Sequence, residues 1–460
     1  MAGERRSGFP FVLMIPGSFK EPPAGGSRGS PHPDPVHGPL TPALSPSDGE
    51  RENVRAVHPW LRRYACLTAL ATFALLGIGG LVTSHGAGMA VPDWPNTNGY
   101  NMFLFPVSKW VGGILYEHSH RLVASFVGVL VVGLTRWLGG RSSRLPLALV
   151  GLAEMLAGGV FLRMGGDWKG AGYFLTGIAG VVLLAAAVWT RNEPAVRPLP
   201  LLGWIAFVAV QLQGLLGGLR VVLLKDEIGI FHATLAQLFF VLLCVIGLLT
   251  TRWWREFPSA RRGEDTAPYL ATRLLVSGAT FLIFAQLILG ATMRHQHAGL
   301  AIPDFPLAYG KIWPATDPAS VQLYNQKRIE ATAVNPITAF QIVLQMVHRL
   351  VALAILAGVA LSAWLTRRHL GSKSPLSKMT LGWCSLIVSQ AILGAATIWS
   401  DKAADVATAH VLLGALSLAS GALISLTAWK ALSIRTAFDE VGRGVFTAPL
   451  THPGDSVATA

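Results

Sequence analysis

Charged side chains are scarce in this sequence. Asp, Glu, Lys and Arg make up only 13% of the 460 residues, whereas hydrophobic residues make up 52%. Apolar runs of about 20 residues recur, and each is long enough to cross a bilayer as a helix. This composition excludes an ordinary soluble domain and predicts a polytopic membrane protein. The net charge of +13 requires no nucleic-acid partner, because Lys and Arg gather in short loops where positive charge sets membrane orientation.

Cysteine is also scarce. The three cysteines, Cys66, Cys244 and Cys384, each lie inside an apolar run, and no two of them share a loop. This arrangement excludes a disulfide framework and a CxxC site. We expect all three to be small buried hydrophobic residues.

The first 57 residues differ from the rest of the chain. They are rich in Pro, Gly and Ser and lack the apolar content that a packed core needs. The apolar stretch at 9–15 is too short for a signal peptide. We expect residues 1–57 to be a disordered cytoplasmic extension, or a stretch upstream of the true start codon.

About ten apolar runs are expected to form transmembrane helices. Their estimated bounds are 61–83, 113–137, 145–162, 170–190, 200–222, 231–250, 270–293, 337–366, 376–398 and 407–430. Every second loop is rich in Lys and Arg, which places those loops and both termini in the cytoplasm. The long loops 84–112 and 294–336 then face the outside. We expect a multi-pass protein of the inner cell membrane.

An internal repeat relates the two halves of the chain. The segment 73–95 aligns without gaps on the segment 284–306, at an offset of 211 residues. The sequence HRLVA also occurs twice, beginning at His120 and at His348. Two repeats in the same orientation imply a pseudo-twofold axis along the membrane normal.

The two halves differ in length. The offset between His120 and His348 is 228 residues, but the offset between His232 and His410 is only 178. The first half therefore carries about 50 extra residues, which the apolar runs within 145–190 explain as a helical hairpin. The expected fold is an all-α polytopic membrane protein of two parallel four-helix bundles plus this hairpin. Its bounds are 58–262 for the first half, 263–432 for the second and 433–460 for a cytoplasmic tail.

Four histidines occupy repeat-related positions near the outer ends of their helices: His120, His232, His348 and His410. Each half then supplies two imidazoles from facing helices, which is a standard place for a cofactor site. Two imidazoles on opposite sides of a flat metal macrocycle give bis-histidine haem ligation. Imidazole also suits Zn, Cu and Fe, but the apolar surroundings favour haem. The two pairs predict two haem sites.

The neighbouring histidines fit this role less well. His118 is two residues from His120 and therefore points to another face of the helix. His85, His295 and His297 lie in the outer loops, where we expect them to be solvated.

One carboxylate distinguishes the two sites. Glu117 and His120 are three residues apart and share a helix face. The second half has Gln345 at the corresponding place before His348. We hypothesise that Glu117 lets one site handle protons while the other only holds a cofactor. The alternative is a glutamate that simply hydrogen-bonds a neighbour.

Arginines follow the candidate ligands directly. Arg121 and Arg349 either pair with haem propionates, because Arg recognises carboxylates in a bidentate manner, or reach the lipid headgroups. Arg220 and Arg294, at outer helix ends, have the same two interpretations.

Two further patterns are interpreted as structural. A glycine follows four residues after each of three glutamines, Gln213, Gln286 and Gln390, which is typical of helix packing in membranes. Asp93 and Asp304 stand in the sequences PDWP and PDFP, where Asp shapes turns.

Four sequences carry a resemblance to a known family. EHSHRLVA, QGLLGG followed by HATLAQ, QMVHRLVA and TAHVLLGAL resemble the haem A synthase family, over about residues 60–140 and 200–432. The resemblance implies oxidation of the C8 methyl group of haem O to a formyl group by successive hydroxylations, for the assembly of terminal oxidases.

The resemblance also implies roles for the site residues. His120 and His232 would bind the substrate haem O, with Glu117 as the catalytic carboxylate. His348 and His410 would ligate a haem b cofactor that relays electrons.

Three features depart from this family. Some members have a cysteine pair in the first outer loop, whereas residues 84–112 contain no cysteine. The hairpin at 145–190 is not part of the usual eight-helix pattern. The extension at 1–57 is likewise outside the resemblance.

Two other functions compete with haem A synthesis. One is a di-haem b-type electron-transfer cytochrome, and the other is a secondary transporter, in which parallel repeats are common. The contrast between Glu117 and Gln345 favours the enzyme over the cytochrome, and the four placed histidines disfavour the transporter. The implied partners are a haem O synthase and the lipid bilayer. A homo-oligomer is compatible with the sequence, which does not identify the electron acceptor.

Overall fold

The computed structural model describes residues 57–432 apart from 167, 189–197, 258–266 and 328–335. The expected extension before residue 57 and the expected tail at 433–460 lie outside the described residues. Ten helices of at least 20 residues run through the described part, and no β-strand is formed there. The expected all-α fold is therefore confirmed.

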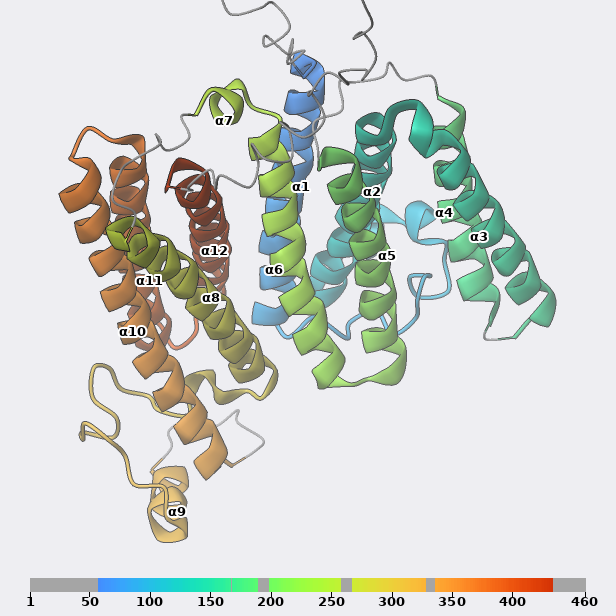
Figure 1. The fold of residues 1–460 in the computed structure, drawn as a ribbon. Helices are drawn as coiled ribbons and strands as arrows, with labels where there is room; N and C mark the ends of the chain where they lie inside the picture. Colours follow the sequence, from blue (N-terminus) through green and yellow to red (C-terminus); the bar gives the residue numbers. More distant parts are fainter. Residues whose placement is uncertain (1–56, 167, 189–197, 258–266, 328–335, 433–460) are drawn as a thin grey trace, which may run out of the picture. The chain divides into compact units, whose positions relative to one another are not determined.

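The long helices follow the ranges expected from the sequence to within a few residues. In chain order they are α1 (Pro59–Ser84), α2 (Gly112–Gly139), α3 (Arg144–Met164), α4 (Trp168–Ala187), α5 (Leu199–Leu223), α6 (Asp226–Leu249), α8 (Ala267–His295), α10 (Ala339–Leu370), α11 (Pro375–Trp399) and α12 (Ala404–Leu432) (Figure 1). Two short helices, α7 (Arg252–Glu256) and α9 (Pro318–Gln326), lie in the connections.

Most of these helices are suited to a bilayer by length and composition. Within the described ranges nine segments qualify as spans, because α2 and α3 run on as one segment, Gly112–Met164. A short 3₁₀ turn, Gly140–Ser143, separates the two helices, so the ten expected helices are all present. The protein is a multi-pass membrane protein.

The helices pack in two groups around separate cores (Figure 1). Helices α1, α2, α5 and α6 contact one another in turn and enclose buried residues such as Leu134 and Leu243. Helices α8, α10, α11 and α12 do the same around Trp383. Between the groups, α1 and α6 contact α12, and Phe240 packs there against Ala415. These contacts are compatible with two four-helix units, whose domain bounds stay a prediction.

Helices α3 and α4 form the expected extra hairpin beside α2 (Figure 1). Small residues bring the two helices close together. A Cβ on Gly158 would lie 2.7 Å from Thr176 Cγ2, and a Cβ on Gly172 would lie 2.8 Å from the backbone nitrogen of Leu162. Because small residues let helix backbones approach in lipid, the hairpin is a tightly packed pair.

The two outer loops repeat one turn. Thr97 pairs with Tyr100 in the first loop, and Ala308 pairs with Lys311 in the second, at the offset of 211 seen in the sequence. Each turn also has a cis peptide bond before its proline. The repeat therefore extends beyond the helices into the loop backbone.

The two aspartates shape these turns, as interpreted from the sequence. The carboxylate of Asp93 accepts hydrogen bonds from the N–H groups of Asn98 and Gly99, at 2.7 and 2.8 Å. Asp304 binds the two equivalent N–H groups at 2.7 and 2.9 Å. The glycine of each turn has a positive φ, which glycine adopts at little cost.

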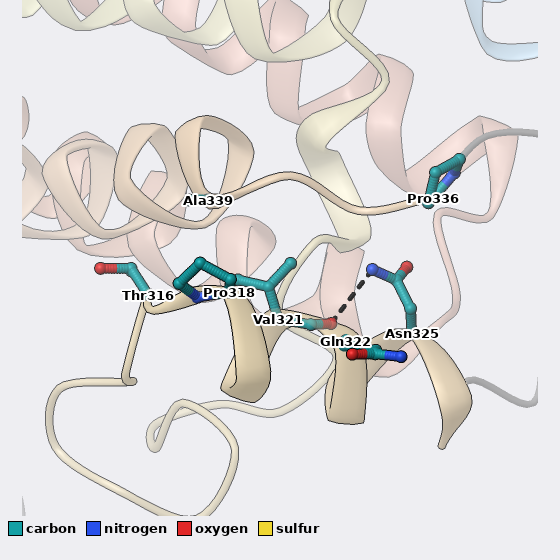
Figure 2. A pocket seen from close by; sticks show the side chains of 7 residues that line it. All are labelled: Thr316, Pro318, Val321, Gln322, Asn325, Pro336 and Ala339. Carbon is teal, nitrogen blue, oxygen red and sulfur yellow. Dashed lines mark hydrogen bonds between the residues drawn. The ribbon is translucent and has the colours of Figure 1, made fainter.

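The second outer loop contains α9 and a cavity of about 470 Å³ (Figure 2). Asp317 caps α9, and hydrogen bonds from the side chain and backbone of Ser320 lower the pKa of Asp317. Asn325 Nδ2 donates to Val321 O at 3.1 Å (Figure 2). The cavity is lined by Thr316, Pro318, Val321, Gln322, Asn325, Pro336 and Ala339. It includes none of the four candidate ligands.

The expectation of three buried cysteines is wrong for Cys66, which is exposed, while Cys244 and Cys384 are half-buried. An apolar residue on a membrane helix can face lipid as readily as protein, because lipid tails are as apolar as a side chain. An apolar run therefore does not predict burial inside the protein.

Trp383 on α11 provides a test of the core that α8, α10, α11 and α12 enclose. Its side chain is 2% exposed and its Nε1 donates to Ser417 O at 2.9 Å. We expect Trp383→Ala to reduce the free energy of unfolding by about 3–5 kcal/mol, because it leaves a cavity. Trp364→Ala, at a 52% exposed position on α10, is the control. Circular dichroism in detergent would measure the midpoint of thermal unfolding of each variant, and equal midpoints for Trp383→Ala and Trp364→Ala would contradict this packing.

Candidate haem-binding site

His120 on α2 and His232 on α6 face each other within the first helix group. Their ring centroids are 6.5 Å apart, and the ring planes make an angle of 77°. In a metal site with two imidazole ligands, each metal–nitrogen distance is about 2.0–2.1 Å, and each ligating nitrogen lies about 1.1 Å from the centroid of its ring. When the two nitrogens are on opposite sides of the metal, the ring centroids are therefore about 6.3 Å apart. One metal ion therefore fits between the two rings.

The donor set favours a metal that brings its own equatorial ligands. No group of three or more His, Cys, Asp or Glu side chains that could hold a metal occurs among the described residues. A structural zinc site has four protein ligands and a catalytic one has three. Two facing imidazoles instead suit the iron of a porphyrin, which supplies the other four nitrogens.

The second pair is built from the second helix group. His348 lies on α10 and His410 lies on α12, two helices of that group. Each ring is half-buried, as are His120 and His232. The structure therefore brings the first pair together and places the second pair on two helices of one group, so the second pairing stays a prediction.

A glycine of the preceding long helix supports each of the four rings. The ring atom Cε1 lies 3.1–3.5 Å from the place of a Cβ on that glycine. The pairs are His120 on Gly79, His232 on Gly217, His348 on Gly290 and His410 on Gly394. A Cβ would be crowded against the ring at Gly79 and Gly394, at 3.1 Å, and would make an ordinary contact at Gly217 and Gly290, so each ring packs directly on its glycine.

Three of the four sites add an amide that holds the backbone of the histidine. The Nε2 donor of a glutamine binds the histidine carbonyl oxygen in the pairs Gln213–His232 at 3.1 Å, Gln286–His348 at 2.8 Å and Gln390–His410 at 3.0 Å. The repeat places Leu75 at the fourth position, on α1. The glutamines were interpreted as packing residues alone, and the structure shows that they and the following glycines directly seat the histidines.

The four histidines share one feature of their ring nitrogens. Nδ1 of all four histidines is buried and has no hydrogen-bond partner among the described residues. Nδ1 and Cε1 of His120 both lie against Gly79, so that edge of the ring is enclosed by helix packing. In His120, Nε2 lies on the other side of the ring from this contact, and imidazole is a suitable ligand for iron.

Glu117 is buried between α2 and the first outer loop. Its Oε2 accepts a hydrogen bond from the N–H of Val91 at 2.8 Å, and its Oε1 accepts from Arg121 at 2.8 Å. In the second half, Gln345 Oε1 accepts from the N–H of Ile302 at 2.7 Å. The carboxylate and the amide therefore hold equivalent loops in the same way and differ in charge.

The two arginines after the ligands also hold the loops. Arg121 donates to the carbonyl oxygens of Val91, Asp93 and Asn96 at 2.7–2.8 Å. Arg349 donates in the same way to two carbonyl oxygens of the second loop, at 2.7 and 2.9 Å. Sequence reasoning missed these contacts, since helix periodicity carries no information about loop carbonyls. The expected pairing of both arginines with propionates stays a prediction.

The remaining histidines lie outside the two pairs. His118 is fully buried and its Nδ1 lies 3.0 Å from Thr97 Oγ1, so it points to the first loop; the expectation was only that it lies on another helix face than His120. His85 and His297 are exposed. His295, expected to be solvated, is only 8% exposed because it ends α8 and packs against Gly229 of α6.

Two further arginines lie near the outer ends of the helices. Arg294 Nη2 donates to Gly80 O at 2.7 Å and to the hydroxyl of Ser84, which ties α8 to α1. The guanidinium of Arg220 lies against Gly88, where a Cβ would be 2.7 Å from Nη2. Their expected roles at propionates or headgroups stay predictions.

Comparison with known proteins gives consistent similarities. The sequence model of the family described as cytochrome oxidase assembly protein (COX15-CtaA) matches residues 174–421, more than half of the chain. Proteins named heme A synthase are similar over most of the chain. One from Geobacillus kaustophilus (strain HTA426) is 25% identical, covering 76% of this chain and 86% of its own length. Those from Hyphomonas neptunium (strain ATCC 15444) and Methylobacterium sp. (strain 4-46) are 23% and 26% identical, covering 78% and 77% of this chain and 90% and 89% of their own lengths.

Helix α11 offers a matched pair of glycines to test the histidine seats. A Cβ on Gly394 would lie 3.1 Å from His410 Cε1, whereas nothing lies within 4 Å of a Cβ on Gly382. We expect Gly394→Val to displace the ring and reduce haem bound at the second pair by about tenfold or more, since ligand geometry is strict. Gly382→Val should leave the amount of haem bound at the second pair unchanged. Absorption spectra of the purified variants measure this, and equal haem content would contradict the seat.

Proposed function

The chain belongs to the family of cytochrome oxidase assembly proteins, and on that premise we propose that it is a haem A synthase. The reaction is oxidation of the C8 methyl group of haem O to a formyl group by successive hydroxylation. The enzyme is thus an oxidoreductase that acts on a methyl group. The observation that carries the proposal is the His120–His232 pair, whose ring separation of 6.5 Å fits one metal.

The two histidine pairs are assigned different haems. His120 and His232 hold the substrate haem O, and His348 and His410 hold a haem b cofactor. Support comes from the charge difference at the outer loops, since a carboxylate precedes only the first pair. When bound, the haem b supplies one-electron redox chemistry, which suits it to carry electrons away from the substrate.

Glu117 is proposed as the proton-handling carboxylate of the first site. It lies one helical turn before His120, and the guanidinium of Arg121 compensates its charge. A carboxylate in this position can accept a proton as the methyl group is oxidised, whereas the amide of Gln345 cannot. The same carboxylate also holds the outer loop through Val91, so the two roles need separate tests.

Two competing functions are less well supported. A b-type cytochrome that only transfers electrons does not need a carboxylate at one site and an amide at the other. A secondary transporter does not need four seated histidines. The similarity to heme A synthases over most of the chain also favours the enzyme.

The distribution of charge in the loops indicates where the reaction takes place. We place the protein in the inner cell membrane with both termini in the cytoplasm, because basic loops alternate along the chain. The partner that supplies the substrate is a haem O synthase. The helix ends that carry the histidines are then near the outer leaflet.

The test of this function is the haem recovered from cells. The protein is expressed together with a haem O synthase in cells that make no haem A of their own, and haems are extracted and separated by chromatography. We expect to recover haem A from cells that express the unaltered protein, and only haem O from cells that express the His120→Met variant. Recovery of haem O alone with the unaltered protein would contradict the proposal.

A glutamine at 117 separates the two roles of Glu117. Gln345 shows that an amide can accept the loop N–H at this place, so Glu117→Gln should keep the loop and remove the charge. We expect haem A formation to fall by about 10²–10⁴-fold, the usual contribution of a positioned acid or base. The matched control, Gln345→Glu, should keep activity. Full activity of Glu117→Gln in the extraction assay would remove the carboxylate from the mechanism.

A further inference from the structure

The α3–α4 hairpin has no part in the chemistry proposed above, yet the end of the hairpin at the C-terminus of α4 is bound to α2. Arg136 on α2 is 4% exposed and donates to the carbonyl oxygens of Ala185 and Val188 at 3.2 and 2.9 Å. These carbonyls end α4. A cation at a helix C-terminus satisfies otherwise unpaired carbonyls and is favoured by the helix dipole.

A polar pair attaches the middle of the hairpin. Gln211 on α5 donates to Glu154 Oε1 on α3 at 2.6 Å. Polar contacts between helices hold them together in lipid, where water offers no alternative partner. Next to this pair, Phe207 of α5 packs with Leu147 of α3 and Val182 of α4 in one buried cluster.

The outer end of the hairpin holds the turn of the first outer loop. The ring of Trp94 lies 4.6 Å from that of Phe174 on α4. A Cβ on Gly170 of α4 would lie 2.9 Å from Pro95 Cδ, and a Cβ on Gly218 of α5 would lie 2.5–2.8 Å from the Trp94 ring. Trp94 therefore fills a slot between α4 and α5 that glycines keep open.

The turn at 91–96 is also hydrogen-bonded to the residues that flank His120. Arg121 donates to Asp93 O and Glu117 accepts from the N–H of Val91. His120 stands between Glu117 and Arg121 on α2. A continuous set of contacts thus runs from the hairpin through the turn to Glu117 and Arg121, the residues that flank His120.

The second half shows the same turn without a hairpin. Phe305 replaces Trp94 and is 38% exposed; its ring has an edge contact with Trp399, at 6.0 Å between centroids, and lies 5.4 Å from the guanidinium carbon of Arg349. Pro306 is exposed, whereas Pro95 is buried. The two turns therefore differ in how they are covered.

We propose that the α3–α4 hairpin positions the turn at 91–96 beside the first histidine pair and so improves retention of the substrate haem there. Gly170 and Phe174 are positioning residues for the reaction. The second part of this inference rests on the proposed function. The first part, that the hairpin holds the turn, does not.

A matched pair of glycines on α4 tests the hairpin. Gly170→Leu should push Pro95 away, whereas Gly177→Leu adds the same side chain where nothing lies within 4 Å. Phe174→Ala removes the ring that covers Trp94, and Phe174→Tyr keeps it. Phe174→Ala serves as the second variant if Gly170→Leu does not fold.

Two buried positions, equivalent in the repeat, report on the two turns. Thr97 and Ala308 are both fully buried, so a cysteine at either is protected from a membrane-impermeant maleimide while its turn is in place. In Thr97→Cys proteins, we expect Gly170→Leu and Phe174→Ala to raise the labelling rate about three- to tenfold, because one lost aromatic contact shifts local opening by such a factor. Labelling of Ala308→Cys should not change.

The second readout is the haem retained on purification from cells that make haem O. We expect Gly170→Leu and Phe174→Ala to lose haem O, counted together with the haem A formed from it, several-fold more than haem b, and Gly177→Leu and Phe174→Tyr to retain both. Unchanged labelling of Thr97→Cys in both disruptive variants would overturn the positioning role. Faster labelling with full retention of haem O would overturn its link to the substrate. If the unaltered chain makes no haem A, the proposed function fails, and the labelling still decides the role of the hairpin.

Discussion

The contact between a histidine ring and a glycine of the preceding helix organises this structure. An imidazole in an apolar bundle needs room beside the next helix and a partner for its polar atoms, since unpaired polar groups are costly there. Glycine provides the room, because a Cβ would lie only 3.1–3.5 Å from the ring. Once two such contacts face each other, as at His120 and His232, the helix positions fix a ring separation that suits one metal.

The outer loops impose the second constraint, and they show how one scaffold is used twice. Each loop is held through its backbone by two side chains that flank a ligand, Glu117 and Arg121 in one half and Gln345 and Arg349 in the other. The loop and the metal seat therefore share a helix segment. Two of the differences between the halves, one charge and one added hairpin, are both in the half assigned to the substrate.

The sequence was sufficient for the helices and for the pairing of His120 with His232. A membrane span has one dominant signal, a long apolar run, and the repeat offsets located equivalent residues such as His232 and His410. The partners of Glu117 could not be predicted, because they are loop backbone groups whose positions depend on turn conformation. The burial of His295 was missed for a related reason, since α8 continues past the end of the apolar run and brings this ring against Gly229.

Leu75 has a consequence for how a large flat molecule could enter the bundle. Three of the seats are tied by an amide that would have to release a carbonyl before the helices part. At the height of His120, a leucine cannot donate, so α1 and α2 meet there through apolar contact that lipid can replace at little cost. The contact between α1 and α2 at His120 therefore lacks the amide tie that joins the two helices at each of the other three seats.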